Sequence, residues 1–222
     1  RLFVFAALIA AAFASCQKDE NFESQSQPEQ SEVAIIPFEL SARTENSEMP
    51  TRLSLGKELK PAWEEGDQLG VYDGVKIQQF DLTDLETSTF TGSLAEGATQ
   101  LNAIYPYGAA TAFAGGKFTA SIPAEQVIEQ GDSLATGALL AMAQPVDIGA
   151  DKVQFAFKNV CGLIRFEISK AGQVKEFIIT GNKGEKFAGE GVIGFETRIE
   201  NEVEKQVPVF APSENAATVV KV

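Results

Sequence analysis

Few residue types in this sequence could carry acid–base or nucleophilic chemistry. Its 222 residues include 31 Asp and Glu and two cysteines, but no histidine. Without an imidazole, there is no Ser-His-Asp triad, histidine general base or imidazole metal ligand. The Glu64-Glu65-Gly66-Asp67 stretch could hold a carboxylate pair or a calcium loop, but abundant acidic residues elsewhere favour a solvated turn. Phosphate-binding loops, dinucleotide fingerprints and EF-hand patterns are also missing from the sequence. We therefore expect a protein that is not an enzyme and needs no cofactor or metal.

Cys16 lies in a different chemical setting. It follows an apolar run, residues 1–13, that begins with Arg and is followed by small residues. That run is shorter than the roughly 20 apolar residues of a membrane-spanning helix, and it has the length of a signal-peptide core. A buried helix or strand is the alternative, which the polar stretch that follows disfavours. Residues 13–16 resemble the lipobox of bacterial lipoproteins, apart from Phe13, where leucine is usual. This resemblance implies that residues 1–15 are a signal peptide and that the Cys16 thiol receives diacylglycerol.

A polar segment directly after Cys16 supplies a second signal. Lys18, Asp19 and Glu20 resemble the export signal of surface lipoproteins in the phylum Bacteroidota. The resemblance implies transport to the outer face of the outer membrane. Residues 16–32, rich in Gln, Glu and Ser, predict a lipidated, disordered tether. Because each buried CH₂ adds about 0.8 kcal/mol of membrane affinity, several acyl chains would hold the protein at the cell surface.

The net charge and the second cysteine bear on the partners and the thiol chemistry that the chain could have. The formal charge of −13 repels phosphate backbones, so we expect no nucleic-acid partner. Cys161 stands among apolar residues, which favours a buried, inert thiol over a reactive one. Lipidation of Cys16 would leave Cys161 without an intramolecular disulfide partner.

Alternating apolar residues dominate the rest of the chain and predict strands. In residues 33–42, Ile36, Phe38 and Leu40 share one face, while Pro37 on the other face suits an edge or incompletely paired strand. Gly115-Gly116 predicts a two-residue hairpin turn. The same alternation recurs in residues 117–123, 153–157, 162–170 and 175–187. Residues 133–143 could instead form a short helix, although a glycine makes this uncertain.

These patterns predict an all-β fold. Many short strands with Gly and Pro turns favour β-sandwiches. We place a boundary near residue 150, with one sandwich domain in residues 33–150 and a second in residues 151–222. The second domain is expected to be incomplete in this sequence.

One motif is specific enough to suggest a family. Trp63, Gly66, Asp67, Gly70 and Val71 reproduce a W-x-x-G-D-x-[IL]-G-V pattern. With the segments that follow in order, it resembles the N-terminal domain of fimbrillin-like proteins, the fimbrial subunits and related lipoproteins of Bacteroidota. Those segments are residues 88–94, 103–107, 120–126 and 153–169, so the resemblance covers nearly all of residues 33–197. A departure is Asn159, where relatives often carry His.

The resemblance implies two transthyretin-like, Greek-key β-sandwich domains and, in polymerising members, assembly by strand donation. There a trypsin-like protease cuts after an Arg that follows the first strand, and a strand of the next subunit fills the groove. Arg43 and Arg52 are the candidates here. Arg43 lies nearer the strand, and a strand that is never cut is an equal alternative. Ser133, in an Asp-Ser-Leu triplet, resembles the O-glycosylation motif of this phylum, but an unmodified turn is favoured.

The leading hypothesis is therefore a structural, tip or anchor subunit of fimbriae that acts in adhesion. Its partners would be other fimbrial subunits, the outer membrane through the lipid, and host or bacterial surface glycans or proteins. A lipoprotein module that binds glycans for uptake is the alternative, and a surface enzyme ranks third. Glycan binding would need exposed aromatic side chains, whereas we expect Trp63 to pack in the core.

Overall fold

Strands make up nearly all the regular structure, as the alternating patterns predicted. The computed structural model describes residues 34–44, 63–128, 139–149, 152–162, 164 and 174–222. This part of the chain contains no α-helix, only one turn of 3-10 helix, η1 (Tyr107–Ala109). The strands are β1 (Ile35–Thr44), β2 (Gln68–Tyr72), β3 (Ile77–Asp84), β4 (Thr89–Ala95), β5 (Gln100–Tyr105), β6 (Ala110–Ala114), β7 (Lys117–Ile122), β8 (Ala141–Asp147), β9 (Gln154–Asn159), β10 (Ile178–Thr180), β11 (Gly189–Glu200), β12 (Val203–Pro212) and β13 (Val219–Lys221). The all-β prediction is confirmed.

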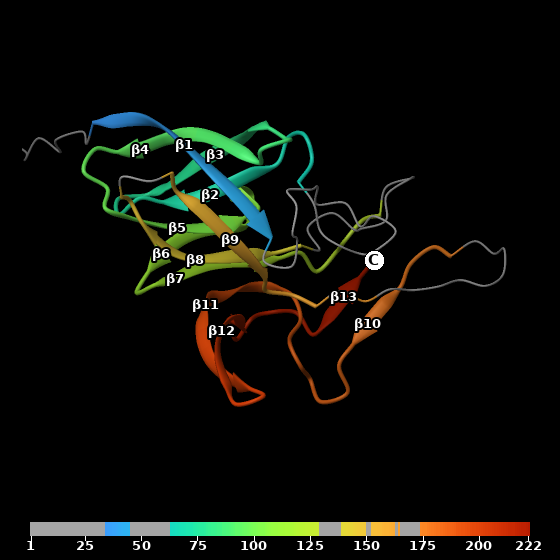
Figure 1. Cartoon of the computed structure of the whole chain (residues 1–222). Helices are drawn as coiled ribbons and strands as arrows, with labels where there is room; N and C mark the ends of the chain where they lie inside the picture. Colours follow the sequence, from blue (N-terminus) through green and yellow to red (C-terminus); the bar gives the residue numbers. More distant parts are fainter. Residues whose placement is uncertain (1–33, 45–62, 129–138, 150–151, 163, 165–173) are drawn as a thin grey trace, which may run out of the picture. The chain divides into compact units, whose positions relative to one another are not determined.

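The first group of strands closes into a barrel in the order β1-β4-β3-β2-β5-β8-β9. Every pair in the barrel is antiparallel except β1 with β9, which is parallel and extends only over Ser41–Thr44 and Gln154–Phe157. In Figure 1, β1 (blue) lies between β4 and β9. The interior is filled by apolar side chains from these strands, including Leu40, Phe90 and Phe155. A short parallel pairing is therefore all that closes the barrel.

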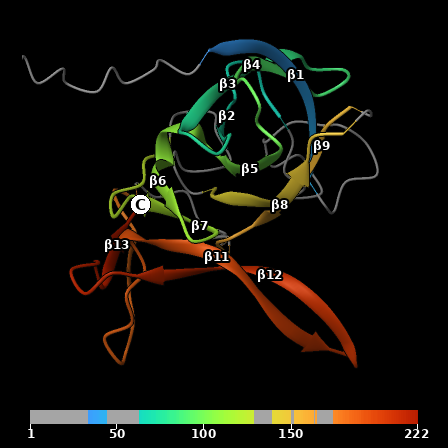
Figure 2. The same ribbon diagram turned by 90° about the vertical axis from the view of Figure 1, so that its left-hand side faces the viewer.

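A second sheet has the order β12-β11-β7-β6, and β10 pairs with β13. Strand β7 pairs with β11 only as far as Ile193. The β11–β12 hairpin continues beyond that pairing, as Figure 2 shows. Side chains of this sheet form a second core with residues of the barrel strands, such as Ile104 and Met142. The barrel and the second sheet are thus joined by apolar packing.

Two hairpin turns connect strands of this sheet. Gly115 and Gly116 have φ values of 57° and 76°, the left-handed region that a tight two-residue hairpin requires, so the predicted turn is confirmed. Asn201 and Glu202 adopt φ values of 52° and 67° between β11 and β12. This second turn contains no glycine, which explains why its sequence gave no clear signal.

Strand pairing runs across the boundary expected near residue 150. Strands β8 and β9 lie on either side of it and pair with each other, and β7 pairs with β11 across it. The segment Val33–Val222 forms one compact unit. Hydrogen-bonded sheets therefore do not separate at residue 150.

Part of the segment that suggested a helix lies in a strand. Ala141, Met142 and Ala143 belong to β8 and are buried. The helical alternative is wrong for these three residues, because cross-strand packing between β5 and β9 outweighs their high intrinsic helix propensity. Residues 133–138 lie outside the described part of the chain.

Candidate functional site

Strand β1 combines a buried face with a partly open edge. Leu40 and Ala42 are 2% and 1% exposed and lie in the barrel core, while Phe38 packs half-buried at its border. Ile36, which the alternation placed on the same face, is 43% exposed. The apolar row predicted from the sequence is therefore buried only from Phe38 onward, since Ile36 lies beyond the packed interior.

Hydrogen bonds show which side of β1 each residue faces. The Ala42 N–H donates to Ser88 O at 3.1 Å, toward β4, and the Ser41 N–H donates to Val153 O at 3.0 Å, toward β9. The backbone N–H and C=O groups of successive residues point to opposite edges of a strand. Those of the even-numbered residues of β1 therefore point toward β4, and those of the odd-numbered residues point toward the β9 side. The β9 pairing begins only at Ser41, so Pro37 faces a side with no strand among the described residues. The prediction of an incompletely paired strand at Pro37 is confirmed.

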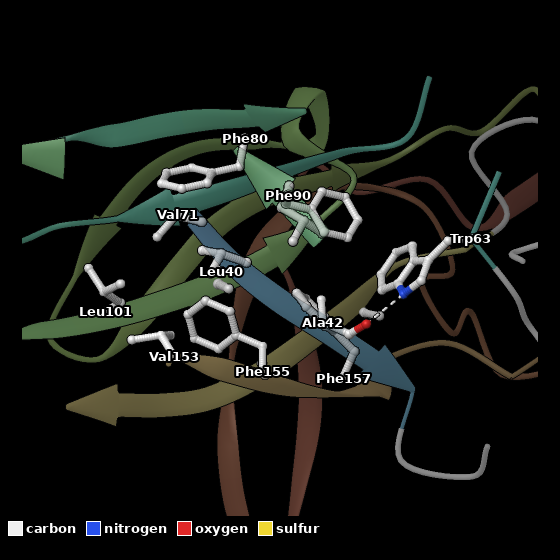
Figure 3. Packing of buried hydrophobic residues seen from close by; sticks show 14 of the residues in the cluster. Leu40, Ala42, Trp63, Val71, Phe80, Phe90, Leu101, Val153, Phe155 and Phe157 are labelled. Atoms are coloured by element: carbon white, nitrogen blue, oxygen red, sulfur yellow. Dashed lines mark hydrogen bonds between the residues drawn. The ribbon is translucent and has the colours of Figure 1, made fainter. Parts of the chain in front are cut away.

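Trp63 fixes the end of β1 from within the barrel. Its indole Nε1–H donates to the Ala42 carbonyl oxygen at 2.9 Å (Figure 3). The ring lies edge-on to Phe90, Tyr105 and Phe157, with centroid separations of 5.2, 5.3 and 5.7 Å. At 1% exposure it belongs to the core, as predicted. Leu69 and Val71, which follow in the same motif, also point into the core, since both are 0% exposed.

The acidic stretch after Trp63 is a turn, as expected, but its aspartate is half-buried rather than solvated. The Glu64 N–H donates to Asp67 Oδ2 at 2.7 Å, and the Tyr105 hydroxyl donates to Asp67 Oδ1 at 2.9 Å. Burial raises the pKa of Asp67, while these two hydrogen bonds act in the opposite direction. Burial and the nearby Asp67 charge raise the pKa of Tyr105. The carboxylate therefore joins the turn to β5.

Asp73 forms a second polar contact that sequence reasoning missed. This side chain, 2% exposed, accepts hydrogen bonds from the backbone N–H groups of Val75, Lys76 and Ala95 and from the Gln78 amide, at 2.8–3.0 Å. Burial alone would raise the pKa of Asp73, but the four hydrogen bonds outweigh it and lower the pKa. The Asp-Gly pair that begins this turn is the sequence signal that could have revealed it.

Arg43 is the one predicted processing residue within the described part of the chain. It is exposed, but β1 extends two residues further than predicted, and Arg43 lies opposite Ala156 of β9. The expectation that Arg43 follows the first strand is therefore wrong, since it belongs to β1, and cleavage there stays a prediction. The remaining predicted site residues lie outside the described residues: Cys16, Lys18, Asp19, Glu20, Arg52 and Ser133.

Cys161 is the one cysteine within the described part of the chain. Burial raises the pKa of the half-buried Cys161 thiol, which keeps it protonated and unreactive near neutral pH. Within the described ranges, no group of three or more His, Cys, Asp or Glu side chains is arranged to hold a metal ion. None of the helical structure described there is long and apolar enough to cross a membrane.

Comparison with known proteins adds no further constraint. No protein-family model, curated protein or solved structure matches this chain.

Proposed function

We propose that the protein is a fimbrillin-type subunit, displayed on the outer membrane through a lipid on Cys16 and acting in adhesion. Lys18, Asp19 and Glu20 direct its export, and its partners are other subunits of the fimbrium. The finer fold assignment, two transthyretin-like β-sandwich domains, belongs to the same proposal. In it, β1 is removed after proteolysis and a strand of another subunit takes its place.

The position of β1 is the observation that carries this proposal. β4 pairs with β1 over Ile35–Ser41, whereas β9 holds only its last four residues. Loss of β1 would leave unpaired backbone groups on β4 and β9 beside an open apolar core. Such an edge is a template for strand addition. Fully burying a Phe or Leu side chain is worth roughly 1.5–3 kcal/mol, so an incoming strand that repeats Leu40 and Phe38 would regain much of the lost stability.

The strand pairing also alters which cleavage position is preferred. A protease needs an extended backbone that is not engaged in a sheet. Arg43 is paired with β9, so cutting there would first require the end of β1 to leave the barrel. Arg52 follows in a polar, turn-rich sequence, and we now favour it as the processing site.

The Trp and Tyr side chains give little support to the glycan-binding alternative. Sugar binding to an aromatic platform needs an exposed ring, but Trp63 is 1% exposed and Tyr72 lies 4.4 Å from Phe113, centroid to centroid. The Tyr105 hydroxyl is bonded to Asp67, and Tyr107 is half-buried. These four residues are all the Trp and Tyr in the chain.

Limited digestion of the folded full chain with an arginine-specific protease, which leaves Lys57 uncut, tests the proposal. Parent protein and the variants Arg43→Gln, Arg52→Gln and the double variant are digested, and the products are separated on a gel that preserves non-covalent oligomers. The parent should form ladders after cleavage, Arg52→Gln should not, and Arg43→Gln should behave like the parent. Cut protein that stays monomeric at high concentration would exclude strand exchange and favour an accessory or glycan-binding role.

A further inference from the structure

Two long strands have edges that no other described strand covers. β12 is the end strand of its sheet and pairs only with β11. In β1, the side opposite β4 is open along Ile35–Leu40, before the β9 pairing starts. Exposed strand edges carry free N–H and C=O groups, and they invite pairing with a second copy of the same chain.

Hydrogen bonds identify the residues that face the open edge of β12. The Ser213 N–H donates to Glu190 O of β11 at 2.9 Å, one position beyond the Gly191–Pro212 pair. Odd-numbered residues of β12 therefore face β11, and even-numbered residues face outward. The carbonyl of Gln206 agrees with this assignment, because it accepts a hydrogen bond from Lys158 Nζ of β9 at 2.8 Å rather than from β11.

Proline occupies outward-facing positions on both edges. Pro212 is an exposed, even-numbered residue of β12, and Pro37 is an exposed, odd-numbered residue on the open side of β1, whereas the even-numbered Pro208 is buried. Proline has no N–H to donate, so each one removes a donor at the edge without costing any bond to its paired strand. Pro145, the other proline within a described strand, lies at an irregularity in the β5–β8 pairing. No proline of the described strands interrupts a regular pairing.

Local charges reinforce these edges. The Lys158 ammonium group donates a hydrogen bond to the Gln206 carbonyl oxygen, so this outward-facing acceptor already has a partner. Beside Pro37, the exposed pair Glu39–Lys152, 3.1 Å apart, lies across the open side of β1. The hairpin tip meanwhile exposes Ile199 at 74%, which provides apolar surface for an unwanted contact.

We propose that Pro37 and Pro212 close these two edges to strand addition by a second copy of the chain. These prolines keep the intact protein from associating edge to edge. This role does not depend on whether β1 is ever exchanged. Replacing the prolines by valine restores the missing N–H groups and raises β propensity, so self-association should appear.

Sedimentation velocity over a concentration series tests this on the full chain, with parent and variants in the same detergent. Pro37→Val/Pro212→Val should self-associate at least about tenfold more tightly than the parent, equivalent to about 1.4 kcal/mol. Pro37→Val should show the same direction of change. Ala211→Val is the matched control, because it adds a β-branched side chain on β12 at an exposed residue whose N–H already faces β11. It should associate like the parent.

A rescue variant separates edge pairing from a general loss of folding. Adding Glu204→Pro to the double variant returns a proline to an exposed, outward-facing position of β12, so association should fall back toward the parent value. Circular dichroism confirms that each variant keeps its strand content. The proposal is overturned if the folded double variant associates no more tightly than the parent, or if Ala211→Val or the rescue variant associates as tightly as the double variant.

Discussion

The indole N–H of Trp63 donates a 2.9 Å hydrogen bond to the carbonyl oxygen of Ala42, 21 residues earlier in the chain. Both residues are 1% exposed. The bond therefore fixes the C-terminal part of β1 to the barrel interior, at the end where β1 also pairs with β9. Trp63 is also the only tryptophan in the chain, so its fluorescence reports directly on whether β1 is in place.

Replacing Trp63 by phenylalanine should loosen β1. Trp63→Phe keeps an aromatic ring against Phe90 and Phe157 but leaves the Ala42 carbonyl buried without this donor. An unsatisfied buried acceptor costs about 1–3 kcal/mol. Urea unfolding should show a loss of that order, and hydrogen exchange should rise in β1 more than in β11. Equal protection of β1 in parent and variant would show that the bond does not hold the strand.

Asp73 should make the protein sensitive to acid. Its pKa is lowered in the folded state, so its contribution to stability is present above the unfolded value of about 3.9 and is lost as the pH falls through the lower folded pKa. Asp73→Asn presents an amide to donors that need an acceptor, and it should cost about 2–3 kcal/mol at neutral pH. The variant should also lose less stability than the parent below about pH 4.

Asp67→Asn is the comparison variant for Asp73→Asn. The pKa of Asp67 is raised in the folded state. Protonation of this carboxyl therefore adds stability as the pH falls through the folded pKa toward the unfolded value of about 3.9, which is the opposite of the effect at Asp73. The Tyr105 hydroxyl can rotate to accept from an asparagine amide, so the cost at neutral pH should be smaller than at Asp73. Urea unfolding of both variants between neutral and acidic pH measures the difference. Two variants with the same pH dependence would contradict both assignments.

Gly92 should tolerate no side chain. It lies opposite Phe38 on β1 and Phe80 on β3, and an added Cβ would lie 2.6 Å from the Gln79 carbonyl oxygen and 2.7 Å from the Phe80 ring. Gly92→Ala should therefore lower the free energy of unfolding by about 1–3 kcal/mol. Gly108→Ala is the control, since nothing lies within 4 Å of its added Cβ. Similar melting temperatures for the two variants would be incompatible with this packing.

Period-two alternation allowed the strand elements to be predicted well. β1, β7 and β9 lie where the apolar rows placed them, and the Gly115-Gly116 turn was found because only left-handed backbone fits there. Alternation reports which face of a strand is buried, but not which strands are neighbours. The closure of the barrel by β1 and β9 depends on residues more than a hundred positions apart, and no local pattern specifies that pairing.

The candidate site was predictable only in part for a similar reason. The family motif located Trp63 and the turn at Gly66-Asp67, but not the Ala42 carbonyl, which offers the same backbone group as any other residue. Arg43 was placed after the first strand because a single exposed residue after an apolar row does not show whether backbone pairing continues. The Asp73 network was missed because its donors are mostly backbone N–H groups.

Lipidation of Cys16 is a separate expectation from the apolar run and small residues before it. Metabolic labelling of growing cells with a palmitate analogue should label the parent protein, and Cys16→Ala should abolish the label because no thiol remains for the diacylglycerol. Cys161→Ala is the matched control and should label like the parent. A Cys16→Ala protein that still incorporates the analogue would rule out this anchor.

Exchange of β1 followed by Trp63 fluorescence tests the central claim most directly. A recognition sequence for a specific protease replaces Arg52, so that one bond is cut in the folded full chain, and a peptide with the sequence of residues 33–44 is added in excess. The emission of Trp63 should shift to longer wavelength as β1 leaves and return when the peptide fills the groove. A peptide with aspartate in place of Leu40 and Ala42 should not restore it. If cut protein keeps the parent emission and takes up neither peptide, β1 is a permanent strand and assembly by its replacement is contradicted.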